Sequence, residues 1–286
     1  MKILFLFTFL TSMLILSDVD PKAYKQQSLK EALTFYASFD EKTDADFAKG
    51  DARIYTADEY DQLPKGKKGL KSKYIQRISD QGVIGGALNF KQKNDHVVFF
   101  KAADNLVYSA QDWSGTVSFW LQLDPNQDLE PGYCDPIQIT DEGYDDASFW
   151  VDFSDKNPRN FRLGVFGDAA VWNPGGGEGG DHPDFLKRLV PAKSVPFSRE
   201  QWTHVVMRFS HLNTAGGSAQ LYLNGKLQGT QQNIKEPFSW ELERATIRLG
   251  ISYVGLMDEL AIFNQALSEE EILALYQLKG GVKSIL

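Results

Sequence analysis

Short stretches in which apolar and polar side chains alternate run through most of the chain. In residues 116–123, Val117, Phe119 and Leu121 fall on one side and the polar residues between them on the other. Alternation with a period of two predicts a β-strand with one buried face. Comparable patterns predict further strands at residues 32–39, 147–153, 161–166, 203–209, 219–223, 246–251 and 256–263.

Turn and cap residues complete this pattern. Asn224–Gly225 lies after a predicted strand and favours a tight hairpin turn. Ser268 and Glu271 form a capping box, which predicts a short C-terminal helix that ends at Gly280–Gly281. Many short strands and one terminal helix indicate an all-β, antiparallel two-sheet sandwich rather than a wound α/β sheet. Residues 58–84 and 172–196 lack strand patterns and are predicted to be long loops, which are often functional.

The N-terminus has a different character. Lys2 is followed by an apolar run at residues 3–16 and by the polar residues Ser17 and Asp18. This order predicts a secretory signal peptide at residues 1–17, an N-terminal extension at 18–31 and one domain at 32–286. The run is shorter than the roughly 20 residues of a membrane-spanning helix, so we expect no integral membrane span in the mature chain. The alternative is an uncleaved N-terminal anchor.

Composition and charge narrow the class of protein. The chain has 286 residues, 42% of them hydrophobic, which is enough for a sizeable core. Its net charge of −8 makes nucleic acid an improbable partner, because no basic excess is present to neutralise phosphates. The single cysteine, Cys134, excludes internal disulfides, cysteine-based metal clusters and a lipoprotein. We therefore expect a protein that is secreted, periplasmic or at the cell surface.

Five motifs occur in a characteristic order along the chain. They are GGALNF at residues 85–90, SFW at 118–120, QWTHVV at 201–206, LYLNGKL at 221–227 and GLMDELAIFNQALS at 255–268. In these motifs the chain resembles the laminin-G-like jelly rolls of the concanavalin A-like lectin/glucanase superfamily, particularly secreted bacterial members. The resemblance covers residues 33–276 and implies a concanavalin A-like jelly-roll sandwich. It says less about activity, because this superfamily includes lectins, adhesion modules, glycosidases and polysaccharide lyases.

Catalytic motifs of that superfamily are missing. Its retaining glucanases carry their acids as Glu-x-Asp-x-Glu or Glu-x-Asp-x-x-Glu on one strand, and this pattern does not occur. Asp258 and Glu259 are adjacent, so in a regular strand they are expected to point to opposite faces. The alternative to a non-catalytic protein is a glycoside hydrolase or polysaccharide lyase whose acids come from separate segments, such as Asp141, Asp152 or Glu178.

Strand alternation also suggests a sugar-binding face. Trp150, Asp152 and Arg162 have the parity of the non-core face of their strands, and aromatic and planar polar groups are what a sugar ring requires. Trp172 lies in a glycine-rich loop and is a second candidate for stacking. Trp120 is interpreted as second-layer core instead.

Acidic residues in two of the predicted strands suggest a structural calcium ion. Laminin-G-like jelly rolls often carry one, and the resemblance implies that Asp40 and Asp258 approach each other if the terminal strands pair. Together these observations predict a secreted, non-catalytic carbohydrate-binding or adhesion module that recognises a polysaccharide or glycoconjugate. A structural protein-interaction domain of the cell envelope is a further alternative.

Overall fold

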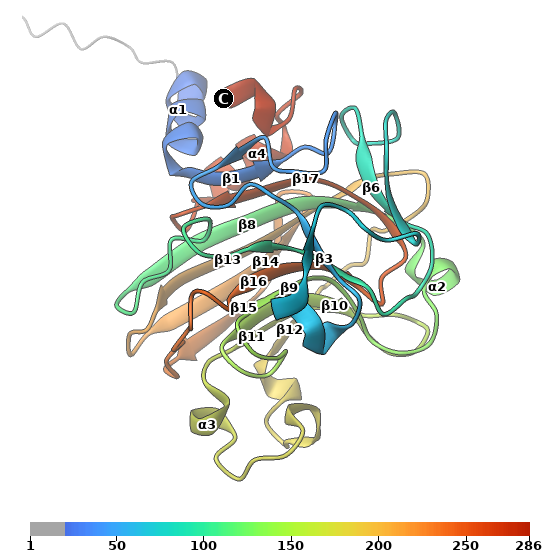
Figure 1. The fold of residues 1–286 in the computed structure, drawn as a ribbon. Helices are drawn as coiled ribbons and strands as arrows, with labels where there is room; N and C mark the ends of the chain where they lie inside the picture. The colour runs from blue at the N-terminus through green and yellow to red at the C-terminus, as the bar shows by residue number, and fades with distance from the viewer. Residues whose placement is uncertain (1–20) are drawn as a thin grey trace, which may run out of the picture.

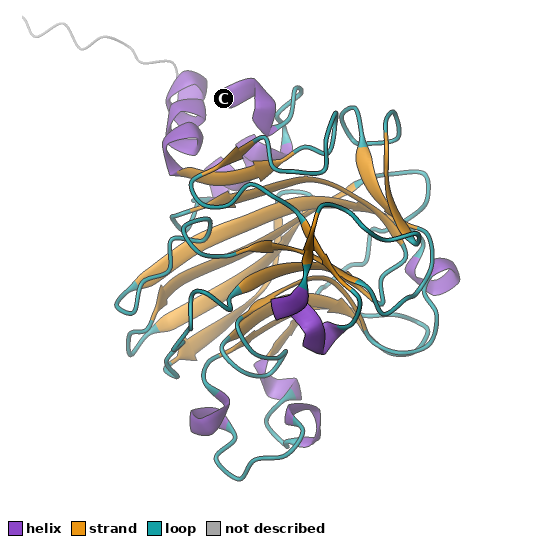
Figure 2. Ribbon diagram, in the orientation of Figure 1, coloured by secondary structure: helices purple, strands orange, loops and turns teal. Residues whose placement is uncertain are grey.

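Two antiparallel β-sheets stack into a sandwich (Figures 1 and 2). The computed structural model describes residues 21–286, so the predicted signal peptide at 1–17 lies outside the described residues. The first sheet has the strand order β15-β14-β13-β8-β17-β1-β2, and β6 pairs with both β17 and β5. Its strands are β1 (Leu33–Ala37), β2 (Phe47–Ala48), β5 (Ile75–Ile78), β6 (Ala87–Phe90), β8 (Trp113–Gln122), β13 (Thr203–Leu212), β14 (Gly217–Leu223), β15 (Lys226–Ile234) and β17 (Gly255–Phe263).

The second sheet has the order β12-β11-β10-β9-β16-β7-β3-β4. Its strands are β3 (Tyr55–Ala57), β4 (Lys67–Lys68), β7 (Val97–Lys101), β9 (Cys134–Thr140), β10 (Ser148–Phe153), β11 (Phe161–Phe166), β12 (Leu189–Pro191) and β16 (Thr246–Ile251). All strand pairs within both sheets are antiparallel. This architecture confirms the predicted all-β two-sheet sandwich.

Helices are short and lie outside the two stacked sheets. The α-helices are α1 (Pro21–Ala32), α2 (Pro125–Asp128), α3 (Ala169–Trp172) and α4 (Glu269–Tyr276), and the 3-10 helices are η1 (Tyr60–Lys65), η2 (Gly179–Asp181), η3 (Leu186–Arg188) and η4 (Val282–Ile285). The predicted C-terminal helix is α4, and both hydrogen bonds of its capping box are present. Of the helices described, none has the length and apolarity needed to cross a lipid bilayer.

The core between the sheets follows the predicted alternation. Val117, Phe119 and Leu121 of β8 share one buried cluster with Phe149 and Val151 of β10. Each of these five side chains is at most 2% exposed. Burial of this apolar surface is the main favourable contribution to folding.

The outer face of the first sheet is covered by helices. Leu29 of α1 and Ile272 of α4 are fully buried against Tyr36 of β1. The Lys30 ammonium donates a hydrogen bond to the Leu286 carbonyl oxygen at 2.7 Å, which joins α1 to the C-terminus. Residues 21–31, expected as an extension, are therefore packed on the sandwich (Figure 1).

The outer face of the second sheet is only partly covered. Parts of the two predicted long loops lie over it: η1 from residues 58–84, and η2 and η3 from residues 172–196. The prediction that these stretches lack strands is wrong at β4, β5 and β12, which are short and lie at sheet edges. The outer sheet face lines two hollows, one on each side of Tyr60 in η1.

Candidate functional site

A row of side chains crosses the outer face of the second sheet. Backbone register places Phe99 opposite Arg248, Arg248 opposite Gln138, Gln138 opposite Trp150 and Trp150 opposite Gly164. Residues directly opposite each other on neighbouring strands point to the same face. The row therefore forms the common floor of both hollows.

The first hollow, which we call the Trp150 hollow, has a volume of about 410 Å³. Volumes of this size are typical of small-molecule sites. Three residues that the sequence predicts for sugar binding line it together, namely Trp150, Asp152 and Arg162. Its other side chains that matter here are Tyr60, Tyr133, Asp135, Gln138, Tyr144 and Phe185.

Trp150 is a wall of this hollow rather than an exposed platform. Its side chain is 3% exposed, its ring stacks on Phe166 with centroids 5.8 Å apart, and its indole N–H donates to the Tyr144 carbonyl oxygen at 2.6 Å. Gly164 permits this position, because a Cβ atom there would lie 2.3 Å from the indole ring. The prediction that a sugar stacks on the face of Trp150 is corrected accordingly, since the ring faces are already packed.

Exposed aromatic surface at the hollow comes from two tyrosines. Tyr133 is 57% exposed and Tyr60 is 36% exposed, so both present ring surface to solvent. The Arg162 guanidinium lies 5.3 Å from the centre of the Tyr133 ring, within the range of a cation–π contact. These two rings are available for stacking on a sugar.

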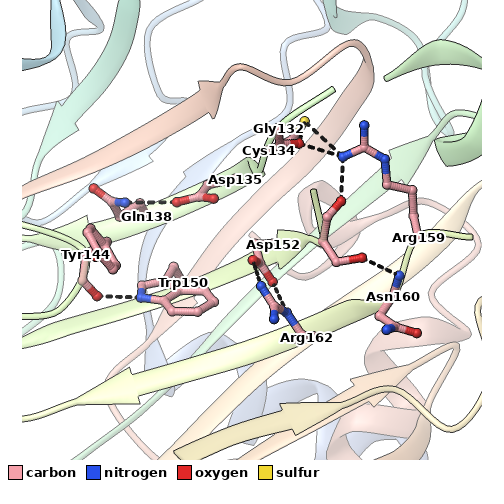
Figure 3. A network of polar contacts seen from close by, with 11 residues as sticks. Gly132, Cys134, Asp135, Gln138, Tyr144, Trp150, Asp152, Arg159, Asn160 and Arg162 are labelled. Atoms are coloured by element: carbon pink, nitrogen blue, oxygen red, sulfur yellow. Dashed lines mark hydrogen bonds and ion pairs between the residues drawn. The ribbon is translucent and has the colours of Figure 1, made fainter. Parts of the chain in front are cut away.

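Charged groups on the floor of the hollow are paired in a defined way (Figure 3). Arg162 binds Asp152 with two hydrogen bonds, one of them from Nε to Oδ1 at 2.9 Å. The Gln138 amide donates to Asp135 Oδ2 at 2.9 Å. Loss of solvent around Asp135, together with the negative charge of Asp152, raises the pKa of Asp135 to about 8. Asp135 therefore carries a proton at neutral pH and can donate a hydrogen bond.

Trp172 does not line either hollow. Its side chain is 5% exposed, its indole N–H donates to the Asp145 carbonyl oxygen at 2.8 Å, and the Arg188 guanidinium lies over its ring. The predicted stacking role of Trp172 is thus corrected: this tryptophan anchors the glycine-rich loop onto the sheet. The segment that follows Trp172 in the chain places Phe185 against the wall of the Trp150 hollow.

The second hollow, which we call the Arg248 hollow, lies on the other side of Tyr60. Its volume is about 560 Å³, and Tyr60 lines both hollows. The Tyr60 hydroxyl accepts a hydrogen bond from Arg248 and donates one to the Gln138 side chain. The phenol ring of Tyr60 thus separates the two spaces.

The alternative catalytic acids do not converge on one hollow. Asp141 lines the Arg248 hollow, where Oδ2 accepts the Glu241 amide at 2.7 Å. Asp152 lies on the floor of the Trp150 hollow, bound to Arg162. Glu178 lines neither hollow and contacts the Tyr144 hydroxyl at 3.4 Å.

Asp40 and Asp258, the predicted calcium ligands, hold the same loop. Asp258 Oδ2 accepts the amides of Val83 and Ile84, and Asp40 Oδ1 accepts the amide of Gly86. Burial raises the pKa of Asp258 to about 8, which weakens it as an ionised ligand. Across residues 21–286, no group of three or more acidic, histidine or cysteine side chains is arranged to hold a metal ion. Calcium binding at Asp40 and Asp258 therefore stays a prediction.

The prediction that the side chains of Asp258 and Glu259 point to opposite faces of the strand is wrong. The pairing of β17 with β8 shifts between Asp258 and Ala261, and Glu259 has φ of 53°. A β-bulge of this kind brings neighbouring side chains to the same side. Asp258 and Glu259 are both buried, and the charge of Glu259 contributes to the raised pKa of Asp258.

Sequence reasoning missed several residues of the two hollows. Tyr60 lies in the predicted loop at residues 58–84, and Tyr133 lies just before β9, for which no strand was predicted. Asp135 and Gln138 lie on β9 itself, where Pro136 interrupts the apolar run. A useful signal was available in Ile137 and Ile139, which alternate with the polar residues Gln138 and Thr140 with a period of two.

Comparison with known proteins identifies the class to which this fold and site belong. Residues 92–273, more than half of the chain, match a laminin-G family model described as the concanavalin A-like lectin/glucanases superfamily. The chain therefore belongs to the concanavalin A-like lectin/glucanase superfamily. None of the curated protein sequences matches the chain.

Solved structures with a similar fold include carbohydrate-related and toxin domains. Domain 4 of AbnA, a GH43 extracellular arabinanase from Geobacillus stearothermophilus in complex with arabinotriose, is 17% identical, with 86% of this chain and 98% of that chain covered and a TM-score of 0.53. The binding domain of botulinum neurotoxin DC in complex with rat synaptotagmin II is 11% identical, with 90% and 52% covered and a TM-score of 0.55. This chain thus spans about half of the toxin chain. At these identities the likeness shows the fold alone.

Proposed function

We propose that this protein is a secreted, non-catalytic carbohydrate-binding module that holds a glycan in the Trp150 hollow. The observation that carries the proposal is the combination, in one hollow of about 410 Å³, of exposed tyrosine rings with a fixed Asp152–Arg162 pair. Aromatic faces suit the apolar side of a pyranose, and planar polar groups suit its hydroxyls. The arabinanase domain that shares this fold was solved with arabinotriose, which supports the same ligand class.

Each group in the hollow has a role in this proposal. The rings of Tyr133 and Tyr60 stack on the sugar, and the Asp152–Arg162 pair accepts and donates hydrogen bonds from a geometry that is already fixed. Protonated Asp135 supplies a further donor at neutral pH. Because Asp135, Asp152 and Arg162 lie on sheet strands, these three groups need little ordering on binding.

Affinity electrophoresis against a panel of polysaccharides tests the proposal. We expect at least one glycan to retard the wild type, and Tyr133→Ala to weaken that binding by about 1 kcal/mol, or roughly fivefold. Tyr24→Ala is the matched control, because Tyr24 is 67% exposed on α1, away from both hollows. Unchanged mobility on every glycan, or equal retardation of Tyr133→Ala and wild type, would remove the site assignment.

One observation favours the catalytic alternative. A carboxylic acid with a pKa near 8 beside a second carboxylate is an arrangement used for general acid catalysis. Against it, Asp152 is bound by Arg162 on both oxygens and is not free to act as a nucleophile or base. Release of reducing ends or unsaturated sugars from any polysaccharide, abolished in Asp135→Asn, would replace the non-catalytic proposal with a hydrolase or lyase.

Export is a separate part of the proposal and rests on residues 1–17. We expect the mature protein to begin at Asp18 and to occur outside the cytoplasm. N-terminal sequencing of the native protein checks this. An intact N-terminus in the membrane fraction would instead support an anchored interaction domain of the cell envelope.

A further inference from the structure

The Arg248 hollow has an aromatic floor and an unusual charge. Tyr55 and Phe99 stack there with ring centroids 5.5 Å apart, and both are less than a tenth exposed. Arg248 reaches the same hollow from β16 and is 1% exposed. A buried guanidinium on the floor of the larger of these two hollows requires an explanation, because taking a charge out of water is costly.

Arg248 is held by neutral oxygen atoms and by the Tyr60 ring, whose centre lies 4.8 Å from the guanidinium carbon. Its Nε donates to Thr246 Oγ1 at 2.9 Å, its Nη1 donates to Gln138 Oε1 at 2.9 Å and to the Tyr60 hydroxyl, and its Nη2 donates to the Glu142 carbonyl oxygen at 3.1 Å. A guanidinium has five N–H donors, so one N–H of Nη2 is left without an acceptor among residues 21–286. Burial lowers the pKa of Arg248 despite the acids in its surroundings.

The neighbouring hollow provides an internal comparison. Arg162 lies on the same sheet face, and Asp152 neutralises it with two hydrogen bonds. Arg248 has no carboxylate in direct contact within the described part of the chain. The two hollows therefore offer different electrostatics to a ligand: a carboxylate binds the guanidinium of one, whereas neutral oxygen atoms and the Tyr60 ring hold the guanidinium of the other.

A second cation lies diagonally across the sheet from Arg248. Lys101 pairs in register with Thr246, two residues from Arg248 on the same strand face, and both cations line the hollow. Lys101 is exposed, forms no ion pair in the described chain and lies over the Tyr55 ring at 5.7 Å. Its ammonium is therefore free to meet a ligand.

Four acids line the Arg248 hollow beside these two cations. Glu142 is bound to Arg244 at 2.8 Å, and Asp141 Oδ2 accepts a backbone amide. The other two acids of the hollow, Asp61 and Glu243, are exposed at its rim, where water screens their charge. None of the four forms an ion pair with Arg248 or Lys101 in the described chain, so both cations can meet an anionic ligand.

We propose that the Arg248 hollow is a second subsite that takes an anionic sugar, with the carboxylate or sulfate of the sugar bound by Arg248 and Lys101. This inference rests on the proposed glycan-binding function and specifies its ligand class. A glycan that crosses from one hollow to the other presents an uncharged residue to the Trp150 hollow and an acidic residue to the Arg248 hollow. The Tyr60 side chain then lies between these two sugar residues.

Pairs of glycans that share one sugar and differ only in charge test whether the negative charge strengthens binding. Oligomers of galacturonate, glucuronate and mannuronate are titrated into the protein beside their methyl esters, and dextran sulfate is compared with dextran. We expect at least one acidic member to bind about tenfold more tightly than its uncharged counterpart, because charge-assisted hydrogen bonds are roughly twice as strong as neutral ones. Which pair shows this preference distinguishes a carboxylate from a sulfate.

Three variants test which side chains cause the preference for the acidic sugar over its uncharged counterpart. Arg248→Gln is expected to abolish the preference for the acidic sugar, and Lys101→Gln, which removes an exposed ammonium that forms no ion pair in the described chain, is expected to reduce it. Lys49→Gln is the matched surface control and should leave it unchanged. The preference of the wild type should also fall between 50 and 500 mM NaCl.

The outcomes separate this inference from the proposed function. Equal binding of acid and ester in every pair, with neutral glycans still bound, overturns the anionic subsite and leaves the Trp150 hollow as the glycan site. An acid preference that survives in both Arg248→Gln and Lys101→Gln also overturns it. Absence of binding to every neutral and acidic glycan overturns both proposals.

Discussion

His204 illustrates how burial fixes the chemistry of a single residue. Its ring is fully buried, its Nε2 lies 2.8 Å from Ser118 Oγ, and Trp120 and Tyr276 pack against it. Burial lowers the pKa of His204 to about 3, because the charged imidazolium would lose its hydration. The Ser118–His204 pair is therefore part of the packing beneath α4 rather than a catalytic pair.

We predict that His204 stays neutral throughout the physiological range. An NMR titration of imidazole ¹⁵N shifts between pH 5 and 9 should show no change for His204. Exposed His211 serves as the reference signal in the same spectra. A midpoint above pH 5 for His204 would contradict its assignment as a neutral core residue.

Two neighbouring aspartates should respond differently to the same substitution. Asp152→Asn leaves the guanidinium of Arg162, which is 11% exposed, without a carboxylate, and we expect a loss of about 3 kcal/mol in unfolding free energy. Asp135→Asn replaces an acid that is already protonated at pH 7, so we expect a change of less than about 1 kcal/mol. Urea unfolding at pH 7 measures both. Similar losses in the two variants would show that Asp135 is ionised.

Among the secondary-structure elements, β17 joins three parts of the chain through its bulge. Asp258 accepts amides from the loop at residues 82–86, and Glu259 accepts the Val282 amide at 2.9 Å and a hydrogen bond from the Tyr36 hydroxyl. Burial raises the pKa of Asp258 to about 8 and that of Glu259 to about 7. The bulge thus buries two acids that bind more protons in the folded state than in the unfolded state.

The stability of the protein should consequently fall as the pH rises. A carboxyl with a raised folded pKa stabilises the fold fully below its unfolded pKa, and this contribution is lost as the pH passes through the folded value. Between pH 6 and pH 9 we expect a loss of about 1.4 kcal/mol from Glu259 alone. Glu259→Gln should flatten this part of the pH profile of the melting temperature, whereas Glu41→Gln, on the surface, should not. Identical profiles for the two variants would contradict this.

Regular elements of the fold could be predicted from sequence because their periodicity is local. β11 and β16 have the predicted bounds, and the parity of β10 and β11 places Asp152 and Arg162 on the correct face. No strand was predicted at β9, because Pro136 lacks the backbone N–H that a strand uses to pair with its neighbour. This proline is accommodated because the pairing of β9 with β10 is irregular beyond Val151.

The rest of the site depends on contacts between distant segments. Tyr60 meets Arg248 across 188 positions of sequence, and no local pattern encodes that approach. The burial of Trp150 likewise depends on Phe185, which comes from a loop with no periodicity. Alternation could show which face Trp150 occupies but not that another segment covers it.

At the scale of the whole molecule, the two outer faces of the sandwich have different roles. Helices α1, α4 and η4 cover the first sheet with a continuous apolar cluster. The second sheet is covered in part by η1, whose Tyr60 lies between the two hollows, and by the excursion that carries α3, whose η2 and η3 border the Trp150 hollow. Both proposed subsites therefore lie on one side of the molecule, along one row of the sheet.

The hydrogen bond between Lys30 and Leu286 has a practical consequence. It places the N-terminal helix beside the last residue, at the end of the sandwich away from α3 (Figure 1). A tag, a linker or a neighbouring domain fused before Pro21 or after Leu286 would extend from the same end. Molecules immobilised on a sensor chip or glycan array through either terminus would share one orientation, so N- and C-terminal fusions should report the same glycan affinities.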